Sequence, residues 1–194
     1  MANSEIPDID LSEQGTYEPG NPATAHQNAK DILGWFVKDF NWDNINKEQA
    51  EIVKEQWGIE PDKNGKFDSD AKSQLFTNAF QAYIGGSSSK FYRNTEENLS
   101  KLTLTNAQLE VIRSRRSNGT SLASVVRDQR FIILHNAFYD QTTPRMTIEF
   151  IHEMSHFSSG SYNGTGDPWQ NPSPINNAYK FSWGIVNLYE KGTK

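Results

Sequence analysis

Two histidines lie four residues apart in the stretch TIEFIHEMSHFSSG, and a glutamate directly follows the first of them. Residues i and i+4 of an α-helix share one face, so His152 and His156 can direct ring nitrogens at one metal ion. Glu153 projects beside that face and can take a proton from a zinc-bound water, whose pKa the ion lowers toward ~7. The spacing therefore predicts a zinc site that activates water for attack on a carbonyl group.

The alternative is a surface helix that carries two histidines by chance, and the neighbouring residues argue against it. Ile148, Ile151, Met154 and Phe157 form an apolar flank beside the histidines, as in a helix packed on a core. Residues 158–160, Ser-Ser-Gly, predict that the helix ends directly after the motif. The chain can then turn back toward the metal.

A catalytic zinc site has three protein ligands and one open position, so a third ligand is needed. The chain contains no cysteine, which leaves histidine and carboxylate as ligands. Asp167, in NGTGDPW, is the one carboxylate that follows the motif closely, and the glycines around it let the loop swing toward the helix. The upstream alternatives are His26 and His135, but His135 lies in a strand pattern typical of a core histidine. We expect Asp167 to be the third ligand.

The segment TIEFIHEMSHFSSGSYNGTGD resembles the aspzincin family of zinc endopeptidases, which includes deuterolysins and peptidyl-Lys metalloendopeptidases. That family pairs HExxH with a downstream Gly-Thr-x-Asp whose aspartate is the third zinc ligand. Gly164, Thr165 and Asp167 match this motif, and the flanking stretches IILHNAFYD and PINNAYKFSW are also similar. The resemblance covers residues 130–183 and implies a zincin-like fold with Zn²⁺ as cofactor.

One position departs from the family pattern. The family continues Asp-x-x-Tyr-Gly, and its tyrosine is thought to stabilise the oxyanion, whereas Asp167 is followed here by Pro-Trp-Gln-Asn. The interval from His156 to Asp167 is also longer than the usual loop. Tyr162 and Tyr179 are the candidates to replace the missing donor, because a phenol near zinc can donate to a developing oxyanion.

The rest of the chain predicts the elements that hold this site. Residues 1–25 are polar and contain three prolines, which indicates a flexible N-terminal arm or linker before a zincin-like metallopeptidase domain at 26–194. Apolar residues with a 3.6-residue period, together with capping residues, predict helices that begin near His26, Asn46, Asp68 and Thr105. Gly85, Gly86 and the three serines that follow them predict the end of the third of these helices.

The stretch RFIILHNAF, residues 130–138, is rich in β-branched and aromatic residues and predicts a strand. We therefore expect an α+β, zincin-like fold in which a mostly helical N-terminal half packs against a small sheet. An edge strand would lie next to the HExxH helix. The 130–138 strand is the expected edge, along which a protein or peptide substrate would bind by strand addition.

Composition excludes several classes of protein. The net charge of −5 argues against a nucleic-acid partner, and Arg113, Arg115 and Arg116 are interpreted as a solvated helix end. No apolar run approaches the roughly 20 residues needed to span a bilayer. No signal peptide is visible. A protease is hazardous to the cell that makes it, so we expect one that is secreted or delivered outside that cell as an effector or toxin. An inhibitor or immunity protein is a possible partner.

These observations predict a zinc metalloendopeptidase that hydrolyses peptide bonds by a zinc-activated water, with Glu153 as general base. The first alternative is a zinc hydrolase of cell-wall peptides, that is, of peptidoglycan. The second is a non-catalytic helical interaction or effector domain with a degenerate zinc site, a hypothesis that the missing family tyrosine keeps open.

Overall fold

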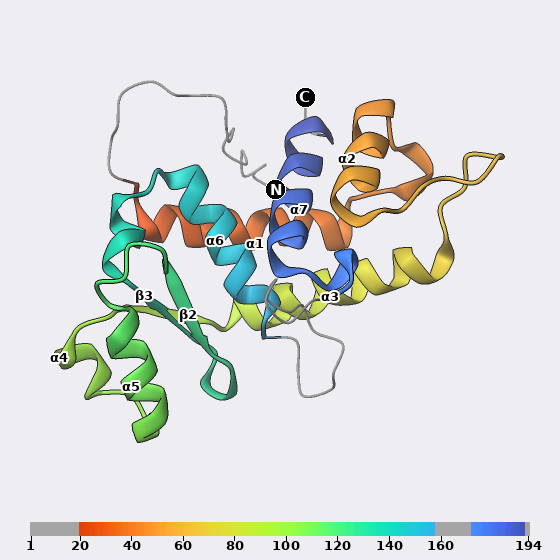
Figure 1. The fold of residues 1–194 in the computed structure, drawn as a ribbon. Coiled ribbons are helices and arrows are strands. Elements are labelled where there is room, and N and C mark those ends of the chain that lie inside the picture. The colour runs from red at the N-terminus through yellow and green to blue at the C-terminus, as the bar shows by residue number, and fades with distance from the viewer. Residues whose placement is uncertain (1–19, 158–171, 193–194) are drawn as a thin grey trace, which may run out of the picture.

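The computed structural model describes residues 20–157 and 172–192, so the proposed ligand Asp167 and the candidate Tyr162 lie outside the described residues. The described part is α+β and mostly helical (Figure 1). Its helices are α1 Pro22–Lys38, α2 Lys47–Trp57, α3 Ser69–Ser87, α4 Glu96–Leu99, α5 Asn106–Arg115, α6 Thr143–Ser155 and α7 Ala178–Gly192. Its strands are β1 Lys90–Arg93, β2 Ala123–Val126 and β3 Phe131–Leu134.

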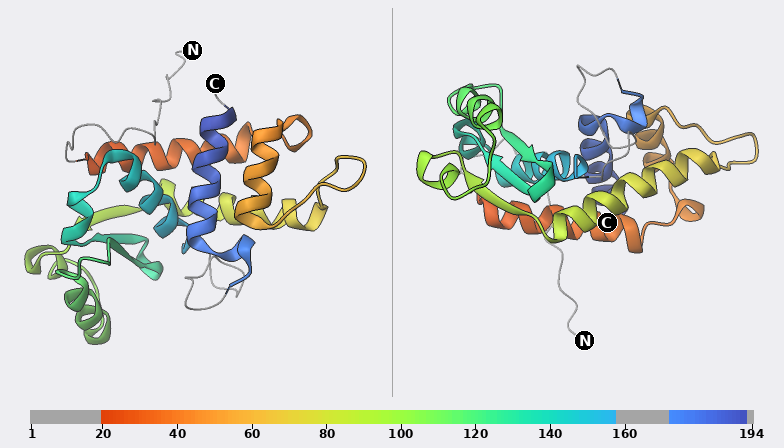
Figure 2. Two further views of the ribbon diagram at one scale, coloured as in Figure 1. Left: turned by 45° about the horizontal axis from the view of Figure 1, so that its top comes forward. Right: turned by 90° about the horizontal axis from the view of Figure 1, so that it is seen from below.

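The long helices form one packed body around α6, which carries the HExxH motif. α1 and α3 pack against α6 and against each other, and α7 packs between α6 and α2. In both views of Figure 2, the sheet and α5 lie to one side of this helical body. The apolar core is continuous from Phe36 in α1 through Phe150 in α6 to Phe181 in α7. The HExxH helix is thus held on several sides.

Helix α3 ends at Ser87, within the predicted stop of two glycines and three serines, but Gly85 and Gly86 themselves lie inside the helix. A Cβ at Gly85 would lie 2.5 Å from the Cβ of Phe157, and one at Gly86 would lie 2.6 Å from the Sδ of Met154. The two glycines therefore serve the close crossing of α3 and α6, where a side chain would separate the helices. Their role is packing and not termination.

The sheet has the order β1-β3-β2, with β1 parallel and β2 antiparallel to β3. The predicted strand at 130–138 is real but shorter, Phe131–Leu134, and a 3₁₀ turn follows at Asn136–Asp140. It is the central strand, so the expectation that it forms the edge beside the active helix was wrong. Its residues Ile132, Ile133 and Leu134 are fully buried because neighbouring strands and helices cover both of its faces. The edge strand next to α6 is β2.

Several local signals in the sequence are confirmed. Asn46 and Gln49 form a reciprocal capping box at α2, and Thr105 and Gln108 form another at α5. The boundary of the first helix differs, because Asn21 caps α1 and Pro22 begins it, a few residues before the expected start near His26. The short elements β1 and α4 were not predicted.

In the part of the chain that the structure describes, we find no helix with the length and apolar character needed to cross a membrane.

Candidate metal centre and its cleft

Helix α6 holds the chemical groups on one face and core residues on the other. It begins after Thr142, with Pro144 in its first turn, where the missing N–H of proline costs no hydrogen bond. Ile148, Ile151 and Met154 are buried in the core, as the sequence predicted. The opposite face carries four polar residues at helical spacing: Glu149, His152, Glu153 and His156.

The two motif histidines converge. The Nε2 atoms of His152 and His156 lie 3.3 Å apart, and both side chains are almost completely buried. Two nitrogens that each lie about 2.0–2.1 Å from a tetrahedral zinc ion are separated by about 3.4 Å. The spacing therefore fits a pair of zinc ligands. The same spacing also permits a hydrogen bond between one protonated and one unprotonated ring nitrogen.

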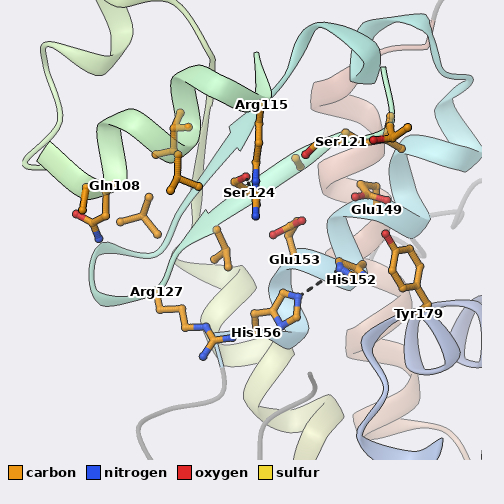
Figure 3. Close-up of a pocket in the computed structure, with 18 residues that line it drawn as sticks. Gln108, Arg115, Ser121, Ser124, Arg127, Glu149, His152, Glu153, His156 and Tyr179 are labelled. Carbon is orange, nitrogen blue, oxygen red and sulfur yellow. Dashed lines mark hydrogen bonds between the residues drawn. The ribbon is translucent and has the colours of Figure 1, made fainter. Parts of the chain in front are cut away.

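Glu153 lines the same hollow beside the two histidines (Figure 3). Its side chain is only 5% exposed, so bulk water does not surround the carboxylate. A carboxylate in this position can accept a proton from a water held at the histidines, which is the role that the motif predicts. The structure thus brings together His152, Glu153 and His156.

Tyr179, one of the two proposed oxyanion donors, lies at this site. It stands in the first turn of α7, and its ring centroid is 4.2 Å from that of His152. The side chain lines the hollow and remains 38% exposed (Figure 3). A phenol here can meet a substrate, and its ring also packs on a motif histidine. Tyr162 lies outside the described residues.

The upstream histidines occupy other places. The Nε2 atom of His26 lies at a hydrogen-bonding distance of 3.0 Å from Ser89 Oγ, and the ring packs against Phe91 and Phe150. Burial, and then the charge of Lys30, lower the pKa of His26 to about 4.

The described ranges contain no group of three His or carboxylate residues placed to hold a metal. Asp167, the expected third ligand, belongs to the segment between them.

His135 is a satisfied core histidine, as the strand pattern indicated. Its Nδ1 lies 2.9 Å from Asn94 Nδ2, and its Nε2 lies 2.9 Å from Ser124 Oγ. Burial, and then the nearby Arg115, lower the pKa of His135 to about 4, so the ring is neutral near pH 7. It bonds the same hydroxyl as Arg115 of α5, so it lies on the α5 side of the sheet.

Glu149 is a site residue that the sequence analysis missed. It precedes His152 by three residues and Glu153 by four, so the helical period could have placed it on the reactive face. Glu149 is 4% exposed, and its Oε2 lies 3.9 Å from Nη2 of Arg145. Burial raises the pKa of Glu149 to about 7, with His152 opposing and Glu153 adding to the rise. A second carboxyl group thus lies beside the motif.

The site opens into a cleft of about 640 Å³ between α6 and the β2 edge of the sheet. The wall facing α6 consists of β2 and its flanking residues, and α5 overhangs it (Figure 3). The N–H of His135 donates to the carbonyl of Leu122 over 2.9 Å, so the pairs 122–135, 124–133 and 126–131 are the hydrogen-bonded ones. The N–H and C=O groups of Ala123 and Val125 consequently point away from β3, toward the edge.

Two arginines of the cluster assigned to a solvated helix end behave as expected, and one does not. Arg113 and Arg116 pair with Glu96 at the surface. Arg115 instead lines the cleft, as does Arg127 at the end of β2. The sequence alone could not separate Arg115 from its neighbours, because the cleft forms only when α5 packs over β2.

Comparison of the chain with family models, with curated proteins and with solved structures finds no match.

Proposed function

We propose that the protein is a zinc-dependent metalloendopeptidase. The observation that carries the proposal is the 3.3 Å separation of the two Nε2 atoms of His152 and His156, with Glu153 buried beside them in an open cleft. A zincin-like arrangement is proposed with it: the HExxH helix α6 lies beside an antiparallel edge strand, β2. The resemblance to aspzincins in the motif and in Gly-Thr-x-Asp points to the same activity.

His152 and His156 would hold the ion, with Asp167 as the proposed third ligand. Zinc, when bound, acidifies a water molecule and polarises the carbonyl group of a peptide bond. Glu153 accepts the proton of the attacking water and then gives it to the nitrogen of the leaving amine. Its burial keeps competing water away from this proton transfer.

Tyr179 supports the same reaction from the first turn of α7, beside His152. Its ring packs on His152 and limits the movement of that imidazole. Its hydroxyl donates a hydrogen bond to the oxygen that gains charge as the carbonyl is attacked. Tyr179 would thereby supply the donor that the family takes from a tyrosine after the aspartate.

The substrate would bind along β2 and not along the 130–138 strand. The outward N–H and C=O groups of Ala123 and Val125 can pair with an extended peptide, which would become a fourth strand of the sheet. The peptide would then lie between β2 and α6, with its backbone passing over Glu153. Pairing through the main chain gives affinity for many sequences, as an endopeptidase requires.

The test combines zinc content with cleavage mapping. The protein is loaded with zinc and incubated with an unfolded protein substrate, and the new termini are identified by mass spectrometry beside a Glu153→Gln sample. The proposal expects one zinc per chain in both proteins and cuts only from the native chain. Cuts that persist with Glu153→Gln would refute the proposed mechanism. A native chain that binds zinc and cleaves no peptide would refute the proposed activity.

A further inference from the structure

The cleft has a basic wall and an acidic floor. The floor is the reactive face of α6, where Glu149 and Glu153 lie. The wall carries Arg115 from α5 and Arg127 from the end of β2, and Figure 3 shows both side chains extending into the hollow. A bound peptide would therefore meet opposite charges on its two sides.

Arg115 is held in place by a chain of buried hydrogen bonds. Its Nη1 donates to Ser124 Oγ over 3.1 Å, and that hydroxyl also lies 2.9 Å from His135 Nε2. The amide of Asn94 donates to His135 Nδ1, so the ring proton must be on Nε2 and is donated to Ser124. Asn94, His135 and Ser124 are all buried, so the oxygen that anchors Arg115 has a fixed position.

Arg115 differs from its neighbours on α5 in its pairing. The arginines on either side, Arg113 and Arg116, share Glu96 at 2.7 and 2.6 Å. Within the residues that the structure describes, neither Arg115 nor Arg127 forms an ion pair with a carboxylate. Arg115 uses one N–H group on Ser124 and has further donors directed at the cleft. A guanidinium placed in this way recognises a carboxylate.

Strand addition would bring alternate side chains of the peptide to this wall. Successive side chains of a strand point to opposite faces of the sheet, so every second residue of a peptide paired with β2 faces α5. Ser124 faces α5 from β2, since its hydroxyl bonds Arg115. Val111, exposed by 48%, and Gln108 lie beside Arg115 on the same helix. Together they offer an apolar surface for a methylene stem and donors for its carboxylate.

We infer that Arg115 is a specificity-determining residue that selects peptides with an acidic side chain, and glutamate before aspartate, at the position facing α5. Arg127 adds to the positive field at the same wall. This inference rests on the proposed peptidase function and names its substrate class. The acidic side chain lies on the far side of the peptide backbone from Glu149 and Glu153, so it is not brought against their charges.

The test begins with the cleavage map of the zinc-loaded native protein, which identifies the position at which acidic residues recur relative to the cut. Three peptides are then made that differ only there, with Glu, Gln or Lys. We expect kcat/KM to be about tenfold higher for Glu than for Gln, through KM, and to fall further for Lys. Added salt should reduce the Glu preference because exposed charges are screened.

Substitutions at position 115 test whether Arg115 causes the preference for the Glu peptide. Arg115→Ala should cleave the Glu and Gln peptides equally, Arg115→Glu should favour Lys, and Arg115→Lys should retain part of the Glu preference. The matched control is Arg113→Ala on the same helix, which faces Glu96 and should behave as the native protein. All variants are checked for bound zinc and for their melting temperature.

The outcomes separate the two claims. Cleavage of all three peptides at equal rates by the native protein would overturn this inference and leave the peptidase function standing. So would a loss of kcat in Arg115→Ala that is the same for every peptide, since that would place Arg115 in the chemical step. If the native zinc-loaded protein cleaves no peptide and no protein, both the inference and the proposed function fall.

Discussion

The ring of Tyr179 lies against the ring of His152, with 4.2 Å between their centroids and an angle of 49° between their planes. This contact joins the first turn of α7 to the motif helix α6. It gives Tyr179 two possible contributions that a single substitution separates, because phenylalanine keeps the ring and removes only the hydroxyl group.

Tyr179→Phe is expected to lower kcat by roughly 10²–10³-fold, the usual loss for one oxyanion donor, with little change in bound zinc. Steady-state kinetics on one peptide identified by cleavage mapping would measure this, with zinc quantified on the same samples. Tyr92→Phe, on β1 away from the cleft, is the control and should leave kcat unchanged. Full activity of Tyr179→Phe would leave Tyr162 as the remaining phenol among the candidates.

His156→Ala is expected to abolish stoichiometric zinc binding, because the remaining ring nitrogen and one carboxylate form an incomplete site. Asp167→Ala should also reduce the amount of bound zinc, because the aspartate is the proposed third ligand. Zinc per folded chain is measured after dialysis against a weak chelator. His26→Asn is the control, since His26 bonds Ser89 and is not among the residues that line the cleft. Equal zinc in His156→Ala and native protein would exclude the proposed ligand pair.

Much of the candidate site could be predicted because its signals are local. The i, i+4 spacing of the histidines and the apolar flank with Met154 act within one or two helical turns, and the structure places the histidines on one face of α6 and the flank in the core. Glu149 obeys the same helical period and could have been included. The HExxH pattern alone does not contain this position.

The remaining features depend on tertiary packing. β1 is four residues long, and its sequence KFYR alternates poorly, so only its pairing with β3 makes it a strand. The order of the strands decides that β2 is an edge, and no periodicity in the sequence encodes that order. Gly85 and Gly86 carry the usual signal for a helix end, but the approach of α6 overrides it.

Gly184→Ala is expected to destabilise the protein by about 1–3 kcal/mol, because the new methyl group would collide with the indole of Trp57. Trp57 is buried on α2 and cannot move aside without opening the contact between α2 and α7. Urea unfolding measures the change. Gly119→Ala is the matched control, since a Cβ there meets no atom within 4 Å and should leave the free energy of unfolding nearly unchanged. Equal stability of the two variants would contradict the close packing of α7.

The free energy of unfolding is expected to fall as the pH is lowered from about 6.5 to about 4. Burial lowers the pKa values of His26 and His135 from 6.5 to about 4 in the folded protein. In this window each of the two histidines takes up a proton in the unfolded chain but not in the folded one. Glu149 acts in the opposite sense down to about pH 4.5, because burial raises its pKa from 4.5 to about 7 in the folded protein, and it offsets one histidine. Stability therefore decreases as the pH falls, by at most about 1.4 kcal/mol per pH unit in sum above pH 4.5. Glu96 changes the stability at lower pH, between about 4.5 and 2, because hydrogen bonds from Arg113 and Arg116 lower its pKa from 4.5 to about 2.

Urea unfolding of the metal-free protein at several pH values separates these contributions, and metal-free protein avoids coupling to zinc release. His135→Asn removes one of the two histidines, so its stability should depend less steeply on pH between 6.5 and 4 than that of the native protein. Below that window, the two proteins should lose stability in parallel as Glu96 takes up its proton. Equal pH dependence of the native protein and His135→Asn between pH 6.5 and 4 would show that the His135 ring accepts a proton in the folded state. The hydrogen-bond chain from Asn94 through His135 to Ser124 would then not persist under these conditions, because a protonated Nδ1 cannot accept from the amide of Asn94.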